Sequence, residues 1–248
     1  MSFEGKVAYV AGAGGMGLRI AQDLIRAGAH VALADLKPAP EKTPAGPGSH
    51  TYFQGDLSDE GFVRKTITDW EQTHGRLDYL VNTTGVLLFG QDQSCLEMDL
   101  DVWDRVVTIN LKSFVLTIRH AVPAMKRSGG GAMVHFSSID ALRGDDRPQD
   151  AYGCSKAAII RLSKSIAIQL ARQRIRSNVI LPGPVHTPMQ ARWDKDPAAL
   201  ERLSDFVPIG RIGTVEDMAN ACLFLLSDKA AFITGTELIV DGGLTARP

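Results

Sequence analysis

The stretch Val10-Ala-Gly-Ala-Gly-Gly-Met-Gly17 joins a short apolar run to a segment with helical periodicity near the start of the chain. Its glycines match Gly-x-Gly-x-x-Gly, in which glycine permits a tight turn and close backbone approach to a pyrophosphate. The amides that open the following helix attract the same anion. A glycine-rich turn can also be merely structural, but strand, loop and helix in this order are the context that the motif requires. We therefore predict dinucleotide binding at Gly12, Gly14, Gly15, Met16 and Gly17.

An acidic residue ends the second apolar run. Asp35 stands 23 residues after Gly12, where a carboxylate can accept hydrogen bonds from both ribose hydroxyls and repel a 2′-phosphate. Neither Ala13 nor Leu36 supplies the cation that a 2′-phosphate requires. The alternative is an aspartate that merely belongs to a turn. The prediction is NAD rather than NADP, with Asp35 and Leu36 beside the adenosine ribose.

Short apolar runs alternate with longer helical stretches along the whole chain. The runs are rich in Val, Ile and Leu rather than strictly alternating, as in strands that are covered on both faces. Strand–helix alternation predicts a parallel sheet between two helix layers. We expect one α/β, doubly wound Rossmann-type domain over residues 1–248, with a seven-stranded parallel sheet. The expected strands are Lys6–Ala11, His30–Ala34, Thr51–Gln54, Tyr79–Asn82, Ala132–Phe136, Asn178–Leu181 and Glu237–Val240, and the expected helices are Gly17–Ala27, Asp59–His74, Asp101–Arg127, Ala151–Arg172 and Val215–Ser227.

Two segments depart from this alternation. Lys37–Ser49 contains four prolines, at positions 38, 40, 44 and 47. Prolines at this density remove backbone donors and prevent a regular helix, so the crossover helix between the second and third strands should be missing or reduced to a turn. Residues 190–210 read as a mobile substrate flap with one short helix.

Composition narrows the possible partners. The 248 residues carry a net charge of −1, 44% are hydrophobic and 22% are charged, which is typical of a globular protein and indicates neither a nucleic-acid nor a membrane partner. Three scattered cysteines form neither a disulfide framework nor a zinc motif, and the histidines lack ligand spacing. We expect no metal, no signal peptide and a cytoplasmic location.

A tyrosine and a lysine stand one helical turn apart in the fourth predicted helix. Tyr152 and Lys156 would share one face of that helix, about 5–6 Å apart. A tyrosine has a pKa near ~10, and a neighbouring ammonium should lower it. Such a pair is more often found on a surface, so it gains meaning only beside the glycine loop.

Taken together, these segments resemble the short-chain dehydrogenase/reductase family in its compact, single-domain form, over residues 3–243. The segments that match it in order are Val10–Gly17, Asp56-Leu57, Asn82–Gly85, Asn110, Ser137-Ser138, Tyr152–Lys156, Pro182–Thr187 and Ile233–Gly243. Three details depart from the family pattern. The glycine loop has Ala11 in place of Thr and is one residue short, Asn-Asn-Ala-Gly reads Asn-Thr-Thr-Gly, and thirteen residues separate Ser138 from Tyr152, one more than is common.

The resemblance implies a catalytic role for four residues. Tyr152 would be the general acid/base, and Lys156 would tune it and bind the nicotinamide ribose. Ser138 would bind the substrate oxygen, and Asn110 would hold a water behind Lys156. As alternatives, Asn110 could cap backbone groups in a helix bend and Ser138 could belong to a turn. The cofactor would also contact Asp56 (alternatively a helix cap), Leu57, Asn82, Thr84, Gly85, Pro182, Gly183, Val185 and Thr187.

The substrate is less well defined by the sequence. The predicted wall is polar, which favours a polyol, a sugar derivative or a hydroxy acid, unless Arg143–Asp150 is only a solvated loop. A hydrophobic cyclic or aryl alcohol packed on Leu87, Phe89, Met189 and Trp193 is the other possibility. The predicted wall comprises Ser138, Asp140, Arg143, Asp145, Asp146, Arg147, Gln149, His186, Met189 and Trp193.

The predicted reaction is NAD-dependent interconversion of a secondary alcohol and a ketone, with a small-molecule substrate. Two rival functions remain open: an NADPH-type ketoreductase, and a non-catalytic NAD-sensing protein on the same fold. The family is commonly homotetrameric, and Ala219–Leu226 and Phe114–Val122 are apolar stretches that could form interfaces.

Overall fold

The computed structural model describes residues 1–40, 45–144, 146 and 148–247. Seven strands form one sheet in the order β3-β2-β1-β4-β5-β6-β7, and every neighbouring pair is parallel. The predicted sheet is confirmed, with strand ends that differ by at most three residues. The strands are β1 (Val7–Ala11), β2 (His30–Asp35), β3 (His50–Gln54), β4 (Tyr79–Asn82), β5 (Gly131–Phe136), β6 (Ile175–Pro182) and β7 (Glu237–Val240).

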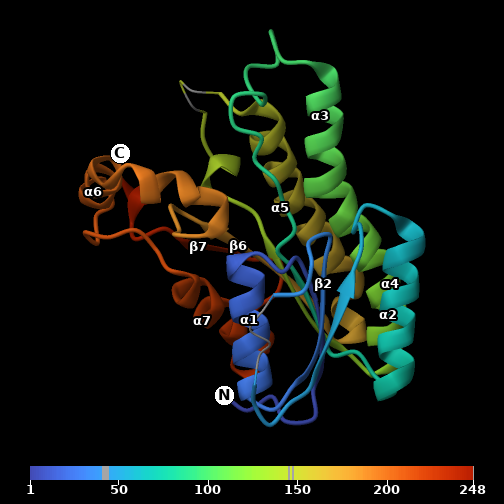
Figure 1. Cartoon of the computed structure of the whole chain (residues 1–248). Helices are drawn as coiled ribbons and strands as arrows, with labels where there is room; N and C mark the ends of the chain where they lie inside the picture. The colour runs from blue at the N-terminus through green and yellow to red at the C-terminus, as the bar shows by residue number, and fades with distance from the viewer. Residues whose placement is uncertain (41–44, 145, 147, 248) are drawn as a thin grey trace.

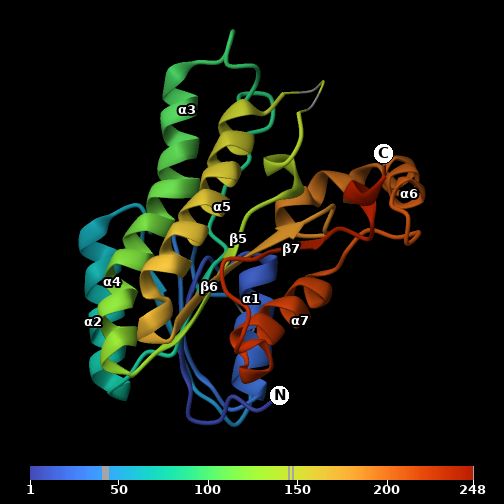
Figure 2. The same ribbon diagram turned by 180° about the vertical axis from the view of Figure 1, so that it is seen from behind.

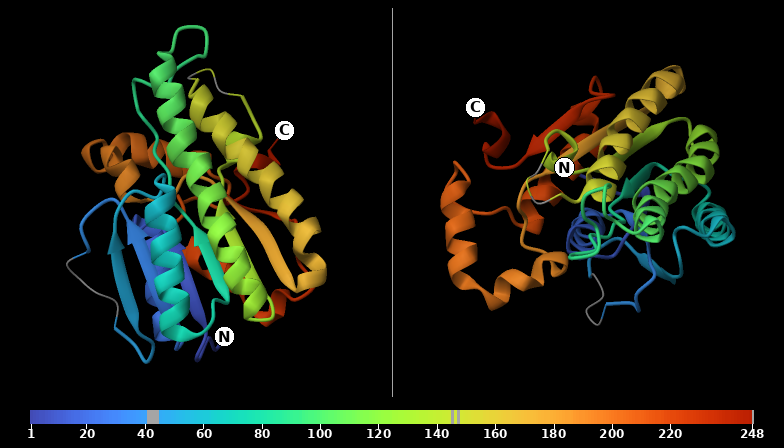
Figure 3. Two further views of the ribbon diagram at one scale, coloured as in Figure 1. Left: turned by 90° about the vertical axis from the view of Figure 1, so that its right-hand side faces the viewer. Right: turned by 90° about the horizontal axis from the view of Figure 1, so that it is seen from above.

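Helices cover both faces of the sheet. On one face lie α1 (Gly15–Arg26) and α7 (Val215–Leu226), and on the other lie α2 (Glu60–His74), α4 (Ser113–Arg127) and α5 (Asp150–Leu170). Figure 1 and Figure 2 show these layers from opposite sides, and the side and top views in Figure 3 show the strands between them.

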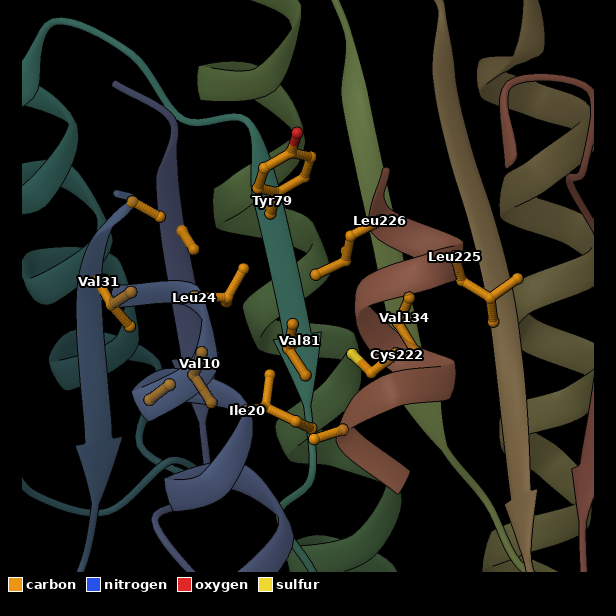
Figure 4. Close-up of a cluster of buried hydrophobic side chains, with 14 of the residues drawn as sticks. Val10, Ile20, Leu24, Val31, Tyr79, Val81, Val134, Cys222, Leu225 and Leu226 are labelled. Atoms are coloured by element: carbon orange, nitrogen blue, oxygen red, sulfur yellow. The ribbon is translucent and has the colours of Figure 1, made fainter. Parts of the chain in front are cut away.

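The core consists of apolar side chains that these layers bury against the sheet. In Figure 4, Ile20 and Leu24 of α1 and Cys222 of α7 meet Val10 and Val81 of the strands. All five are fully buried. A second cluster fills the opposite face, where side chains of α2 and α4 pack on β1 and β4. Burial on both faces explains why the strand sequences are nearly continuous apolar runs.

The predicted helix Asp101–Arg127 is three pieces in the structure. They are α3 (Leu100–Val107), a π-helical turn η1 (Thr108–Lys112) and α4. Bulges of this kind are frequent at functional sites, and this one carries Asn110. The break could not be predicted because the apolar periodicity of the sequence runs through it.

The proline-rich segment between β2 and β3 agrees with the prediction where the structure describes it. Residues 36–40 and 45–49 contain no helix, and Pro44 lies outside the described residues. The predicted flap contains a 3₁₀ stretch, η4 (Pro188–Lys195), and a helix, α6 (Pro197–Phe206), which stands out beside the C-terminus (Figure 1). Among the described helices, none has the length and apolar character to cross a bilayer.

Candidate active site

The glycine loop follows β1 and leads directly into α1. Gly12 has φ of +98°, and a Cβ on it would lie 2.8 Å from the Thr84 nitrogen. A Cβ on Gly17 would lie 1.9 Å from the Gly12 carbonyl oxygen. Both positions therefore require glycine, as the motif predicts. Gly14 differs, because a Cβ there would meet nothing within 4 Å, which leaves the backbone open for a ligand to approach.

A cavity of about 450 Å³ opens at the carboxyl ends of β1, β2 and β4, where parallel sheets of this kind bind their ligands. Its size is in the usual range for a small-molecule site. It continues from the glycine loop to an apolar wall next to the predicted catalytic residues. The lining comprises Gly12, Gly14–Gly17, Asp35–Lys37, Asp56–Ser58, Thr83–Phe89, Ile109, Ser113 and Thr187–Met189.

Asp35 lines this cavity at the end of β2. Its Oδ2 accepts a hydrogen bond from the Ala13 nitrogen at 2.6 Å, and its Oδ1 accepts one from the Lys37 nitrogen at 2.9 Å. The carboxylate therefore braces the glycine loop at the edge of the cavity. Lys37 is the only cation among the described lining residues. The sequence-based prediction did not include Lys37, which follows Leu36 directly.

The other predicted cofactor residues divide into two groups. Asp56, Leu57, Thr84, Gly85 and Thr187 line the cavity together with the glycine loop and Asp35. Asp56 makes a turn in which Oδ1 accepts from the Ser58 nitrogen at 2.8 Å, and the helix that follows is capped by Asp59 instead. Thr83, which the sequence did not indicate, lines the cavity and donates to the Gly12 carbonyl oxygen at 3.0 Å.

Six predicted cofactor residues do not line the cavity: Asn82, Tyr152, Lys156, Pro182, Gly183 and Val185. The Asn82 amide lies in the core, where Nδ2 meets His135 Nδ1 at 3.1 Å and Oδ1 accepts from Thr117 at 2.9 Å. Gly183 packs against Asp241, and Val185 is buried beside Gly213.

The residues present fit a dinucleotide. Thr84 Oγ1 is buried yet has no hydrogen-bond partner among the described residues, and Thr84 lines the cavity. A buried hydroxyl without a partner is costly, so a ligand oxygen at this place would satisfy it. The open backbone at Gly14 and the Asp35 carboxylate place further polar groups along the same wall of the cavity. If a dinucleotide binds, the glycine loop would hold its phosphates and Asp35 its adenosine ribose.

Tyr152 stands in the first turn of α5 and faces Ser138, which follows β5. Burial raises the pKa of the phenol to about 12, the nearby Asp140 carboxylate adds to this rise, and the interaction with Ser138 opposes it with a smaller effect. The direction is the opposite of the sequence-based expectation. The Tyr152–Lys156 spacing predicted that the ammonium would lower the pKa of the phenol. In the structure, the desolvation of the phenolate has the larger effect and raises this pKa.

Lys156 lies behind the cavity wall. Its Nζ donates to the Phe136 carbonyl oxygen at 3.1 Å and lies 5.6 Å from the centre of the Tyr152 ring. Nζ is also 3.2 Å from where a Cβ on Gly85 would be. Gly85, which has no side chain, therefore lies between the cavity and this ammonium. Burial lowers the pKa of Lys156 to about 8.

Asn110 is fully buried in the π-helical turn. Its Oδ1 accepts from the Val86 nitrogen at 2.7 Å, and its Nδ2 donates to the Val86 carbonyl oxygen at 3.0 Å and to Ser155 Oγ at 3.2 Å. These bonds fix the loop after β4. They agree with the alternative of an asparagine that satisfies backbone groups, and the water-holding role stays a prediction.

The predicted substrate residues do not form one wall. Asp140 Oδ2 accepts from Ser138 Oγ at 3.2 Å, and Asp140 Oδ1 pairs with Arg143 at 3.1 Å. His186 Nε2 lies 2.8 Å from Asp194 Oδ1, so the polar groups of both Asp140 and His186 already have partners within the chain. Met189 lines the cavity, whereas Trp193 does not. Asp145 and Arg147 lie outside the described residues.

Much of the wall near the catalytic residues is instead apolar, formed by Val86–Phe89, Ile109 and Met189. The sequence indicated Leu87, Phe89 and Met189 only for the hydrophobic alternative. Among the described residues there is no group of three or more His, Cys, Asp or Glu side chains that could hold a metal ion.

Comparison with known proteins agrees with this geometry. The family model described as enoyl-(acyl carrier protein) reductase matches residues 10–245. The 2-(S)-hydroxypropyl-CoM dehydrogenase 3 of Xanthobacter autotrophicus is 36% identical, over 97% of this chain and 96% of that protein. The (3R)-3-hydroxyacyl-CoA dehydrogenase of Canis lupus familiaris is 35% identical, over 96% and 95%. The ligand-free aldohexose dehydrogenase structure from Thermoplasma acidophilum matches with a TM-score of 0.90 and 30% identity, over 99% of this chain and 96% of that chain.

The parallel sheet, the glycine-loop cavity and the tyrosine–lysine pair are those of a Rossmann-type oxidoreductase. The chain belongs to the short-chain dehydrogenase/reductase family. It is accordingly an oxidoreductase that acts on hydroxyl or carbonyl groups of a small molecule, and its cofactor is NAD or NADP.

Proposed function

We propose that the protein is an NAD-dependent dehydrogenase that interconverts a secondary alcohol and a ketone. The observation that carries the choice of NAD is the Asp35 carboxylate in the cavity wall. A carboxylate at the end of the second strand favours a ribose with free hydroxyls and repels a 2′-phosphate.

In the proposed mechanism, nicotinamide supplies the hydride acceptor when it is bound. Ser138 donates a hydrogen bond to the substrate oxygen after giving up its contact with Asp140. The Tyr152 phenolate takes the hydroxyl proton as the carbinol hydrogen leaves as hydride. Lys156 stabilises the phenolate by its positive charge. Positioned acid/base groups of this kind contribute ~10²–10⁴-fold to the rate.

The apolar wall narrows the substrate class. Leu87, Leu88 and Met189 offer contact area but no hydrogen bonds, and the polar candidates Asp140 and His186 already have partners. We propose a secondary alcohol whose larger substituent is apolar. We propose that residues 190–210 act as a substrate flap. Pro188, just before them, packs against the glycine loop, because its Cδ lies 2.9 Å from where a Cβ on Gly15 would be.

A second candidate is an NADPH-dependent ketoreductase, and Lys37 is the observation that favours it. Lys37 lines the cavity beside Asp35, and its ammonium could pair with a 2′-phosphate. The non-catalytic alternative is disfavoured by the presence together of Ser138, Tyr152 and Lys156.

The test is NADH or NADPH formation across a panel of alcohols, with the reverse reaction on the matching ketones. The panel should contain aryl and cyclic secondary alcohols, polyols, aldohexoses and hydroxy acids. Tyr152→Phe should bind NADH as the wild type does and lose nearly all turnover. If Tyr152→Phe keeps its turnover, the proposed mechanism is wrong.

We also propose a homotetramer by analogy with the family. Most of Phe114–Val122 and about half of Ala219–Leu226 are buried within the chain. Val115 on α4 and Ile168 on α5 are exposed and offer a better apolar contact. Light scattering after size-exclusion chromatography measures the mass of the assembly, and a monomer at micromolar concentration would refute the proposal.

A further inference from the structure

The helix that carries Tyr152 has no side-chain cap of its own. Gln149 occupies the N-cap position of α5 and makes no capping hydrogen bond with its side chain. The amides of the first helical turn have no partner within the helix and need an acceptor elsewhere. The acceptor comes from a residue 60 positions earlier in the sequence, in the loop between β4 and α3.

That residue is Asp92. Its Oδ1 accepts from the Ala151 nitrogen at 3.1 Å, and its Oδ2 accepts from the Tyr152 nitrogen at 2.9 Å. Asp92 is only 2% exposed, and it forms no ion pair among the described residues. Burying a carboxylate without a cation is unfavourable. The two amides and the positive end of the helix dipole are the groups that offset this cost.

The loop of Asp92 is also part of the cavity wall. Asn110 fixes its start at Val86, and Leu87–Phe89 line the cavity. Next to Asp92, the Asp150 nitrogen donates to the Gln93 carbonyl oxygen at 3.2 Å, and the Cys95 nitrogen donates to Asp150 Oδ2 at 2.8 Å. Loop residues 86–95 and the first turn of α5 are therefore joined at several points.

We propose that Asp92 is a positioning residue that fixes Tyr152 relative to the substrate wall. Its carboxylate holds the backbone of the acid/base residue, and the loop that supplies this carboxylate also supplies Leu87–Phe89. The placement of the phenol and the shape of the wall then depend on one buried side chain. This inference rests on the proposed function for its effect on turnover, but the mechanical coupling can be measured without any substrate.

The test compares Asp92→Asn with the wild type. The amide keeps one acceptor oxygen and replaces the other by a donor, so one of the two α5 amides loses its partner. A displacement of about 1 Å at a reacting group can lower a rate ~10²-fold. We expect kcat to fall at least ~10-fold and KM for the alcohol to rise, whereas the Kd for NADH changes less than twofold because the glycine loop is not touched.

Asp59→Ala is the control. Asp59 is the N-cap of α2 and accepts from the Phe62 nitrogen at 3.1 Å, so this variant removes a helix cap away from Tyr152. It should lower the melting temperature and leave kcat unchanged. Equal kcat in Asp92→Asn and the wild type would overturn the proposal. So would a parallel loss of kcat, NADH binding and stability in both variants.

A second measurement needs no turnover. Amide hydrogen exchange followed by mass spectrometry should show faster exchange in Asp92→Asn in both the 86–98 loop and the 150–153 turn, with the glycine loop unchanged. Faster exchange in only one of the two segments would refute the coupling. If no alcohol or ketone is turned over by the wild type, the proposed function fails, and the exchange data still decide the coupling.

Discussion

Lys156 Nζ lies 5.6 Å from the centre of the Tyr152 ring and donates its hydrogen bond to the Phe136 carbonyl oxygen at 3.1 Å. The ammonium thus acts on the phenol through space, from a position fixed by the end of β5. Because burial lowers the pKa of Lys156 to about 8, most of it carries a charge at neutral pH, and this charge is lost as the pH rises through about 8.

The first prediction removes this ammonium. Lys156→Met keeps the apolar stem but leaves the phenolate without its cation, so kcat for alcohol oxidation should fall ~10²-fold or more. Lys164→Met is the control, because Lys164 lies on the same helix, is half exposed and pairs with Glu237. Steady-state kinetics with NAD at pH 7 measure both. Similar kcat values for the two variants would exclude the proposed role of Lys156.

A second prediction concerns the pH profile. The Asp140 carboxylate contributes to the raised pKa of Tyr152, and oxidation requires the phenolate. Asp140→Asn removes the negative charge but keeps an acceptor for Ser138, so the pKa of the phenol should move down. The alkaline rise of kcat/KM for oxidation should then occur at lower pH, with a higher rate at pH 7 than in the wild type.

The measurement for this second prediction is kcat/KM for the alcohol between pH 6 and pH 10. Asp228→Asn, beside the amino-terminal ends of β4 and β5, changes the net charge by the same amount and should leave the profile in place. A profile that moves to higher pH in Asp140→Asn would show that Asp140 acts in another way.

The sheet and the glycine loop were predictable because their evidence is local. A strand such as Tyr79–Asn82 is buried on both faces of the sheet, and its apolar run shows this in the sequence. The spacing of Gly12 and Gly17 follows from the direct contact between these two residues within one short loop. Each of these patterns has one structural solution in a strand–loop–helix unit.

The site was less predictable because its details depend on distant residues. The break in the predicted helix at Thr108–Lys112 coincides with hydrogen bonds from Asn110 to Val86, 24 positions away. The cap of α5 comes from Asp92 and leaves no mark near Tyr152 in the sequence. The pKa of the phenol depends on how deeply it is buried, which the Tyr152–Lys156 spacing does not reveal.

A third prediction addresses cofactor choice. In Asp35→Ala the ribose hydroxyls lose a charged acceptor, a contact worth ~1.5–3 kcal/mol, so the Kd for NADH should rise at least ~10-fold. The variant also loses the charge that repels a 2′-phosphate, and Lys37 becomes available to it. NADPH should therefore bind more tightly to Asp35→Ala than to the wild type.

The double variant Asp35→Ala/Lys37→Ala separates the two effects in a fluorescence titration of reduced cofactor. It should lose the gain in NADPH affinity and keep the weakened NADH binding. Tighter NADPH than NADH binding by the unaltered protein would contradict the proposed NAD preference and support the ketoreductase alternative.

The fourth prediction uses two glycines of one loop. A Cβ on Gly17 would lie 1.9 Å from the Gly12 carbonyl oxygen and 2.5 Å from Thr83 Oγ1, so Gly17→Ala must displace the loop, at a cost of ~1–3 kcal/mol in the free energy of unfolding. Gly14 has φ of −63° and ψ of 176°, which alanine adopts freely, and a Cβ there meets nothing within 4 Å. Gly14→Ala should therefore keep its melting temperature and still weaken NADH binding at least ~10-fold, because its methyl group enters the space where a pyrophosphate must approach the backbone.

Thermal melts and NADH titrations of both variants provide the comparison. Undiminished NADH affinity in Gly14→Ala would mean that the dinucleotide does not lie against this loop.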